Sequence, residues 1–304
     1  MLKTFKIRIL GCAAALPTST THTTAQWLQV HNQNFLLDCA EGTQMLIRKA
    51  KLPMMKIENI FISHLHGDHY LGLPGLLFSY HLLGREKELN IYSPPGLEEI
   101  INTQLRISNV KTRYKTVFHE IKQGKQLLFE NEKVFVESIE MKHSIPCFGF
   151  LISEKPHERN IKKDCIKKYN FTILEMKGIK QGKDYIDKNN NVILNEKLTI
   201  SPPPVRKYAF CSDTVYDENC IDQIKNADLL YHEATFLQDK AEIAKEKMHS
   251  TAAEAAKIAK KANVKTLILG HYSARYDDIN EFKKEASQIF PNTIIAEEGL
   301  VIDI

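Results

Sequence analysis

The chain has 304 residues, of which 43% are hydrophobic and 26% are charged, and its formal net charge is +4. This composition is close to the average for soluble globular proteins and argues against a disordered protein. Polar residues interrupt every apolar run before it reaches the roughly 20 residues that cross a bilayer, so we expect no membrane-spanning segment and no membrane partner.

The first half of the chain alternates strand-like and helix-like patterns. Period-two alternation predicts strands, and periodic apolar residues bounded by glycine predict helices. The expected strands cover residues 6–10, 26–30, 35–38 and 59–63, and the expected helices cover residues 42–51 and 72–84. Strands then dominate, at residues 117–121, 126–129, 134–141 and 148–153.

A segment of different character follows, over residues 154–204. Between positions 151 and 207 the chain has 13 lysines and arginines against 7 aspartates and glutamates, and the segment ends in three prolines. Its apolar residues are too sparse and irregular to cover a sheet. We therefore predict an inserted basic arm at residues 154–204.

The alternation returns after residue 207. We expect strands at residues 208–212, 229–233, 266–269 and 300–304, with helices between them. The clearest helix covers residues 251–262, with Ser250 or Thr251 as its cap and Glu254 in its first turn. Two mixed β/α halves predict two sheets packed face to face with helices outside, which is an αββα sandwich of the α/β class. One such domain would span residues 1–304.

A run of potential metal ligands follows the apolar strand near residue 60. His64, His66, Asp68 and His69 stand within six residues, and imidazole and carboxylate are the usual ligands of Zn²⁺ and similar ions. The alternative, buried or surface polar groups without a metal, would leave three imidazoles and a carboxylate to be satisfied at considerable cost. Further candidates stand at the ends of later expected strands, namely His143, Asp213 and His271.

These residues, preceded by Asp38, occur in the order of the metallo-β-lactamase superfamily motifs, and the sequence resembles that superfamily over nearly its whole length. The resemblance implies two Zn²⁺ ions per subunit, although the same ligands also accept Mn²⁺ or Fe²⁺. It places the first ion on His64, His66, His143 and Asp213. It places the second on Asp68, His69, His271 and the shared Asp213. Asp38 would orient the histidine run without binding an ion.

Within the superfamily the sequence is most similar to the ribonuclease Z family. The similarity lies in residues 37–44 (LDCAEGTQ), in the GDHxxGLPGLL run that ends at Leu77, and in the HEAT and HST motifs that begin at His232 and His249. It implies a homodimeric endoribonuclease that removes the 3′ trailer from precursor tRNA, leaving a 3′-hydroxyl on the tRNA and a 5′-phosphate on the trailer.

The resemblance also implies roles for individual residues. Asp68 would accept a proton from the attacking water, His249 would protonate the departing 3′ oxygen, and Glu233 would hold the His249 imidazole. The alternative makes His249 a helix-start residue and Glu233 a strand-end carboxylate. His232 would point to the opposite face of its strand from Glu233, outside the site.

In this family an arm binds the body of tRNA, and the resemblance implies the same for residues 154–204. The candidate phosphate contacts are lysines, namely Lys162, Lys163, Lys167, Lys168, Lys177, Lys180 and Lys183. Tyr169, Phe171 and Tyr185 are the aromatic residues available for stacking. An ordinary solvated insertion is the alternative.

The sequence departs from the family pattern in two places. Residues 171–176 stand where the arm's Gly-Pro motif is expected, and residues 17–22 lack the basic residues of the PxKxRN loop. These departures fall in the segments that the resemblance assigns to the tRNA elbow and to discrimination against CCA at the 3′ end.

Two other functions compete with tRNA processing. A hydrolase of small phosphodiesters or sulfate esters would keep the metal site without needing the arm, and a non-catalytic RNA-binding module would not need a complete set of metal ligands. Every ligand position is filled, which disfavours the non-catalytic reading. The six cysteines are scattered and form no CxxC pair, which suits the reducing cytoplasm.

Overall fold

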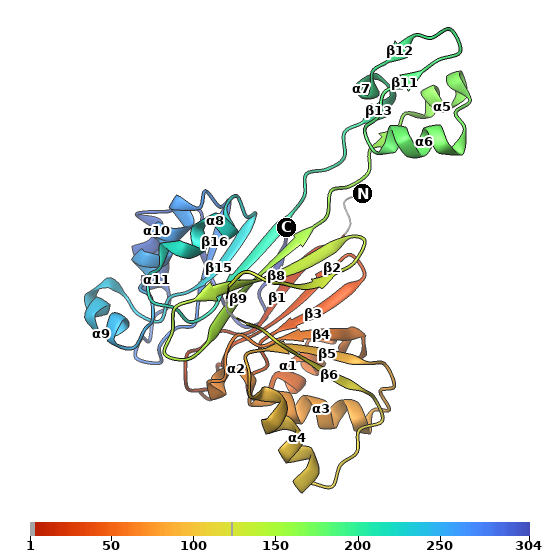
Figure 1. The fold of residues 1–304 in the computed structure, drawn as a ribbon. Coiled ribbons are helices and arrows are strands. Elements are labelled where there is room, and N and C mark those ends of the chain that lie inside the picture. The colour runs from red at the N-terminus through yellow and green to blue at the C-terminus, as the bar shows by residue number, and fades with distance from the viewer. Residues whose placement is uncertain (1–3, 123) are drawn as a thin grey trace. The chain divides into compact units, whose positions relative to one another are not determined.

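The computed structural model describes residues 4–122 and 124–304 and divides them into two compact units (Figure 1). The smaller unit covers Glu154–Val205, and the larger contains the described residues up to Ser153 and those from Arg206 to Ile304. Among the described residues, no helix combines the length and the apolar character that crossing a membrane would require.

The first sheet of the larger unit has seven strands in the order β18-β1-β2-β3-β4-β5-β6. Strands β1 to β3 are antiparallel neighbours, and β3 to β6 run parallel, joined by crossovers that carry helices. The strands are β1 (Phe5–Gly11), β2 (Ala25–Val30), β3 (Gln33–Leu37), β4 (Ile57–Phe61), β5 (Leu89–Ser93), β6 (Thr116–Glu120) and β18 (Val301–Asp303). The helices are α1 (Thr43–Lys49), α2 (Gly67–Tyr70), α3 (Gly72–Leu82) and α4 (Leu97–Ile107).

The second sheet also has seven strands, in the order β17-β16-β15-β14-β9-β8-β7. Strands β14 to β17 run parallel, and β9 pairs antiparallel with β14. The strands are β7 (Leu127–Glu130), β8 (Val134–Met141), β9 (Cys147–Glu154), β14 (Lys207–Cys211), β15 (Leu229–Glu233), β16 (Thr266–Gly270) and β17 (Thr293–Ile295). The helices are α8 (Ile221–Ile224), α9 (Ala241–Glu246), α10 (Ala252–Lys261) and α11 (Asn280–Ser287).

Two hydrophobic clusters show how these layers pack. The larger cluster joins the inner faces of the two sheets, where the rings of Phe61 in β4 and Phe150 in β9 lie 5.4 Å apart between centroids. The second lies between the first sheet and its helices and includes Leu36, Ile60 and Leu76. Helices therefore cover the outer face of a two-sheet core, which confirms the predicted αββα sandwich.

The clearest predicted helix, over residues 251–262, forms as α10. Thr251 is its N-cap and makes a capping box with Glu254, so that two backbone N–H groups at the helix start are satisfied. Ser250, the other candidate cap, instead donates to the backbone oxygen of Thr214 at 2.7 Å. The sequence did not single out β5, α4 or β17.

The smaller unit has a core of its own. Two short strand pairs, β10 with β13 and β11 with β12, are accompanied by three helices. Its elements are β10 (Asn160–Ile161), α5 (Lys163–Tyr169), α6 (Ile173–Lys180), β11 (Tyr185–Ile186), β12 (Val192–Ile193), α7 (Asn195–Leu198) and β13 (Thr199–Ile200). Phe171, Ile179, Tyr185 and Leu198 are buried together. Phe171 and Tyr185 are thus 8% and 7% exposed. The expectation that these two rings are available for stacking is wrong, because this small core needs them.

Candidate metal centre

The potential ligands gather at one edge of the two sheets. His64 and His66 follow β4, and α2 carries Asp68 and His69. In the second sheet, Asp213 follows β14 and His271 follows β16, while His143 lies between β8 and β9. Parallel strands end at the same edge of a sheet, which is why residues far apart in the sequence meet here.

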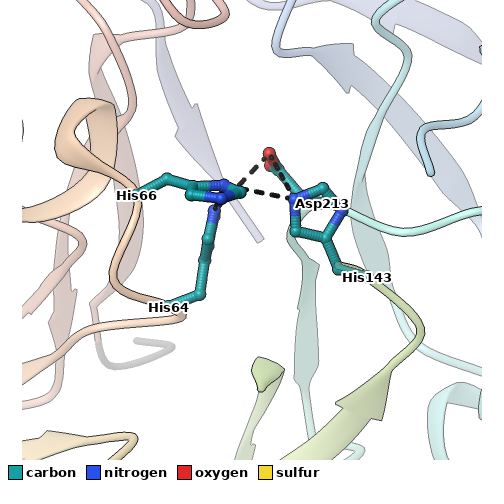
Figure 2. Close-up of side chains that lie close together, drawn as sticks. All are labelled: His64, His66, His143 and Asp213. Carbon is teal, nitrogen blue, oxygen red and sulfur yellow. Dashed lines mark hydrogen bonds and ion pairs between the residues drawn. The ribbon is translucent and has the colours of Figure 1, made fainter. Parts of the chain in front are cut away.

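The first group contains His64, His66, His143 and Asp213 (Figure 2), whose ligand atoms all lie within 4.8 Å of one another. His66 Nδ1 is 3.1 Å from His64 Nε2 and 3.2 Å from His143 Nε2. Asp213 Oδ2 is 3.7 Å from His64 Nε2. Atoms that carry lone pairs thus converge on one point, as the ligands of a cation do.

The second group contains Asp68, His69 and His271. The Nε2 atoms of His69 and His271 are 3.3 Å apart, and Asp68 Oδ2 is 3.5 and 3.4 Å from them, respectively. Asp213 Oδ1 lies 3.5 Å from His69 Nε2 and 3.4 Å from His271 Nε2. Asp213 therefore directs one carboxylate oxygen to each group.

The far ring nitrogens of these histidines show that the residues fit metal ions. The backbone oxygen of Met248 lies 2.9 Å from His143 Nδ1 and can only accept a hydrogen bond. The proton of the neutral ring is therefore on Nδ1, and His143 Nε2 keeps its lone pair for a metal. The Nδ1 of His271 lies 2.9 Å from Thr235 Oγ1, and that hydroxyl in turn donates to Glu233. Each partner fixes the tautomer that a ligand needs.

Asp38, directly and through Ser63, holds the far ring nitrogens of two histidines in the run that begins at His64. Its carboxylate accepts hydrogen bonds from the Ser63 backbone N–H at 2.7 Å and from the Ser63 hydroxyl at 2.9 Å. His69 Nδ1 lies 2.8 Å from the same carboxylate, and His64 Nδ1 lies 3.0 Å from the Ser63 hydroxyl. Asp38 thus lies outside both groups, where it orients two of their imidazoles.

Burial sets the charge of the first group. It lowers the pKa of His64, His66 and His143, and so favours the neutral imidazole that binds a metal. The second group behaves differently. Burial lowers the pKa of His69 as well, but the carboxylates of Asp213 and Asp38 outweigh it and raise that pKa well above its usual range. The same carboxylates would stabilise a cation in place of that proton.

His249 and Glu233 form a buried pair beside the two groups. His249 Nδ1 is 3.0 Å from Glu233 Oε1, and Glu233 is fully buried. Burial lowers the pKa of His249, but the Glu233 carboxylate outweighs it and raises the pKa to about 9. Burial raises the pKa of Glu233, but His249 and the hydrogen bonds to this carboxylate bring it down to about 2. His232 donates from Nδ1 to the backbone oxygen of Glu233 at 2.7 Å and lies outside the cavity lining.

A cavity of about 740 Å³ opens over both groups and the His249 ring. Its wall also contains groups that the sequence motifs did not point to, Lys247 and Arg275 among them. Gly270 is required just before His271, because a Cβ there would lie 2.2 Å from the buried Tyr231 hydroxyl. Thr235, inside the HEAT motif, proves to connect His271 with Glu233.

The arm lysines lie on α5, on α6 and just beyond these helices. Six are exposed, namely Lys163, Lys167, Lys168, Lys177, Lys180 and Lys183. Lys162 is half-buried, and its ammonium donates to the backbone oxygens of Glu196 and Lys197. Thr172 and Glu175 form a capping box at the start of α6, where the Gly-Pro motif was expected.

The fold and the two ligand groups define a metal-dependent hydrolase of the metallo-β-lactamase superfamily. Residues 180–272 match the beta-lactamase superfamily domain. Residues 5–164 belong to the family whose model is described as anti-Pycsar protein Apyc1, a match that ends before Asp213 and Glu233.

Relatives along the full length narrow the assignment. The chain is 43% identical to ribonuclease Z of Bacteroides fragilis over 304 residues, which cover 100% of both chains. It is 40% identical to ribonuclease Z of Porphyromonas gingivalis over 301 residues, 99% of each chain. The crystal structure of human tRNase Z, short form, aligns over 98% of both chains with a TM-score of 0.71 and 28% identity. The chain belongs to the ribonuclease Z family.

Proposed function

We propose that the protein is an endoribonuclease that removes the 3′ trailer from precursor tRNA and leaves a 3′-hydroxyl on the tRNA. One observation carries this proposal: a His/Asp metal centre and the buried Glu233–His249 pair line one cavity. The full-length identity to ribonuclease Z supports the same function.

Two divalent ions would be held at the centre. One would lie on His64, His66, His143 and Asp213, and the other on Asp68, His69, His271 and the shared Asp213. Nitrogen and carboxylate ligands suit Zn²⁺, with Mn²⁺ and Fe²⁺ as alternatives. Such ions supply Lewis acidity toward the phosphate and lower the pKa of an attacking water.

The chain's own residues would move the protons. Asp68 would accept the proton of the attacking water, and the Ala15 backbone N–H, 2.8 Å from Asp68 Oδ2, fixes its carboxylate. His249 would give a proton to the departing 3′ oxygen, because its ring lines the cavity while its Nδ1 is held by Glu233. The Glu233 charge stabilises the imidazolium until the proton is delivered.

The arm, residues 154–204, would bind the body of the precursor tRNA. Its six exposed lysines can contact backbone phosphates, which contribute most of the sequence-independent affinity for RNA. Lys162 is not expected to contribute, since two backbone oxygens already occupy its ammonium group. The buried aromatic rings favour phosphate contacts over base stacking.

Helix α3 supports a homodimer. Its sequence, GLPGLLFSYHL, lacks a charged face, and Pro74 and Phe78 are partly exposed beside Ser79 and His81, which is unusual for the outer side of a helix in a monomer. Leu71 and Leu82 at its two ends are 52% and 81% exposed. Gln44 Oε1 and His81 Nδ1 are buried and find no hydrogen-bond partner among the described residues. A second copy packed on this face would cover the apolar side chains.

We also propose a cytoplasmic location, which six free cysteines suit.

The size of the cavity favours one alternative function, the hydrolysis of small phosphodiesters or sulfate esters. Its volume of about 740 Å³ lies within the range of sites for small ligands. A small phosphodiester or sulfate ester could enter it without touching the arm.

Cleavage of a 3′-extended precursor tRNA, with and without a chelator, tests the proposal. We expect a chelator-sensitive cut just after the discriminator base that leaves a 3′-hydroxyl. His249→Ala should keep the metals and lower turnover by roughly 10²- to 10⁴-fold. His119→Ala is the matched control, because that imidazole lies 2.8 Å from the Asn90 amide oxygen, stacks on the Tyr92 ring and is not among the residues that line the cavity. If precursor tRNA is not cut while bis(p-nitrophenyl) phosphate is still hydrolysed, the result would favour a hydrolase of small esters instead.

A further inference from the structure

The segment from Cys12 to His22, here called the early loop, supports the second ligand group through its backbone. Ala15 N–H donates to Asp68 Oδ2 at 2.8 Å. The backbone oxygen of Cys12 accepts from the backbone N–H of His271 at 2.8 Å. Both Ala15, with a φ of 58°, and His271, with a φ of 62°, have left-handed backbone conformations. Such conformations are costly for residues other than glycine and persist only where the surroundings impose them.

The early loop does little to hold itself in place. Residues 15–20 are all exposed. The main internal contacts are a turn in which Thr18 N–H donates to the Thr21 oxygen at 2.8 Å, and a bond between the two threonine hydroxyls at 2.7 Å. A turn of this kind shapes the loop without fixing it to the sheet.

The early loop is held at two points, one of which is the Ala14 backbone N–H, which donates to the Tyr272 oxygen at 2.9 Å. The other is His22. Its backbone oxygen accepts from the N–H groups of Cys12 and Ala13, both at 3.0 Å. On its other side, Glu298 Oε1 accepts from the backbone N–H of His22 and lies 2.9 Å from His22 Nδ1. The neighbouring Gly299 is tied to the oxygen of Ile9 in β1 at 2.9 Å. The two side chains are only partly exposed, at 34% and 22%.

We propose that Glu298 and His22 are positioning residues for the second ligand group. Glu298 holds His22, and the backbone oxygen of His22 holds the N–H groups of Cys12 and Ala13. The early loop then presents the Ala15 N–H to Asp68 and the Cys12 oxygen to His271. The pair contacts no ligand itself and acts only through this chain of hydrogen bonds. The inference rests on the metal centre proposed above and deepens it, because it makes one ion more dependent than the other on a remote contact.

Two substitutions at position 298 isolate the contact. Glu298→Ala removes the acceptor of both bonds, whereas Glu298→Gln keeps a carbonyl oxygen that can accept both. Glu297→Ala is the matched control. Glu297 is the exposed neighbour of Glu298, carries the same charge, and its side chain makes no hydrogen bond in the part of the chain described. Each purified full-length protein is titrated with Co²⁺ against a competing chelator, and urea unfolding is followed in parallel.

We expect Glu298→Ala to bind the Co²⁺ ion at the second ligand group, here called the second ion whatever the order of binding, at least about 10-fold more weakly, the lower end of the range for lost outer contacts to ligands. The first affinity, the unfolding midpoint and KM for bis(p-nitrophenyl) phosphate should stay near wild type, while kcat falls. Glu298→Gln should recover the second affinity, and Glu297→Ala should never lose it.

Equal second-ion affinity in Glu298→Ala and Glu297→Ala would overturn the proposal. So would a parallel loss of both ions with a lower unfolding midpoint, since that would indicate a general structural role. If Glu298→Ala does not fold, His22→Ala removes the one contact with Glu298 that the imidazole makes and keeps the backbone N–H and oxygen of His22. It should weaken binding of the second Co²⁺ by a smaller factor, and wild-type affinity for that ion would then overturn the proposal. Wild-type protein that binds no Co²⁺ would instead count against the metal centre itself.

Discussion

Replacing Glu233 by glutamine tests whether the buried carboxylate holds the His249 imidazole and keeps it protonated. Its Oε1 accepts from the backbone N–H groups of Thr214 at 3.1 Å and Ser250 at 2.9 Å, and lies 3.0 Å from His249 Nδ1. Its Oε2 accepts from the backbone N–H and the hydroxyl of Thr235, both at 2.9 Å. A carboxylate suits this position because every neighbour is a donor.

Glutamine must place its NH₂ group against one of these two sets. Either choice leaves at least one buried backbone N–H facing another donor, and a backbone N–H cannot reverse its role. The expected loss is about 1–3 kcal/mol of unfolding free energy. The neutral amide also removes the charge that raises the His249 pKa to about 9, so that pKa should fall. Turnover should then drop by roughly 10²- to 10⁴-fold, as expected for loss of the acid itself.

Urea unfolding and single-turnover cleavage of precursor tRNA measure the two effects. Residues that act as a unit are not additive, so the double variant with His249→Ala should be no slower than either single variant. Multiplying losses would refute the reasoning, because the carboxylate would then act independently of the imidazole. Glu254→Gln is a matched control, since glutamine also serves in a capping box.

Two further predictions concern the metal centre and the arm. Asp213→Ala should remove metal and activity together, because its two oxygens face different ligand groups; metal analysis that finds both ions retained would contradict its shared role. Replacing residues 155–204 by an Asn-Gly turn should weaken cleavage of precursor tRNA while sparing bis(p-nitrophenyl) phosphate, and equal loss on both substrates would indicate misfolding.

The sequence predicted which side chains gather in the two candidate ligand groups better than it predicted their surroundings. His64, His66, Asp68 and His69 stand in one short run, and strand ends pointed to the remaining ligands. The partners that fix the tautomers could not be predicted, because Met248 contributes a backbone oxygen to a histidine 105 positions away. A backbone group carries no sequence signal of its own.

The elements that the sequence missed have physical reasons too. Strand β17 has 3 residues, too few for an alternation to register. Helix α4 buries only Leu97 and Ile101 among its 11 residues, so its apolar face is narrow. In the arm, the sparse and irregular apolar residues predicted an insertion that is not part of the sandwich core. They gave no sign that four of them would form a separate core.

The place where the arm leaves the sandwich has a consequence for how this protein can change over generations. Ser153 and Lys207 are directly paired across the antiparallel strands β9 and β14, so the arm is inserted where a hairpin turn would otherwise stand. A recombination event at these two neighbouring positions can exchange the whole unit without altering the register of any strand. The proposed role of the arm in binding a large substrate and the proposed chemistry of cleavage would therefore be separately heritable, and selection could act on one while leaving the other intact.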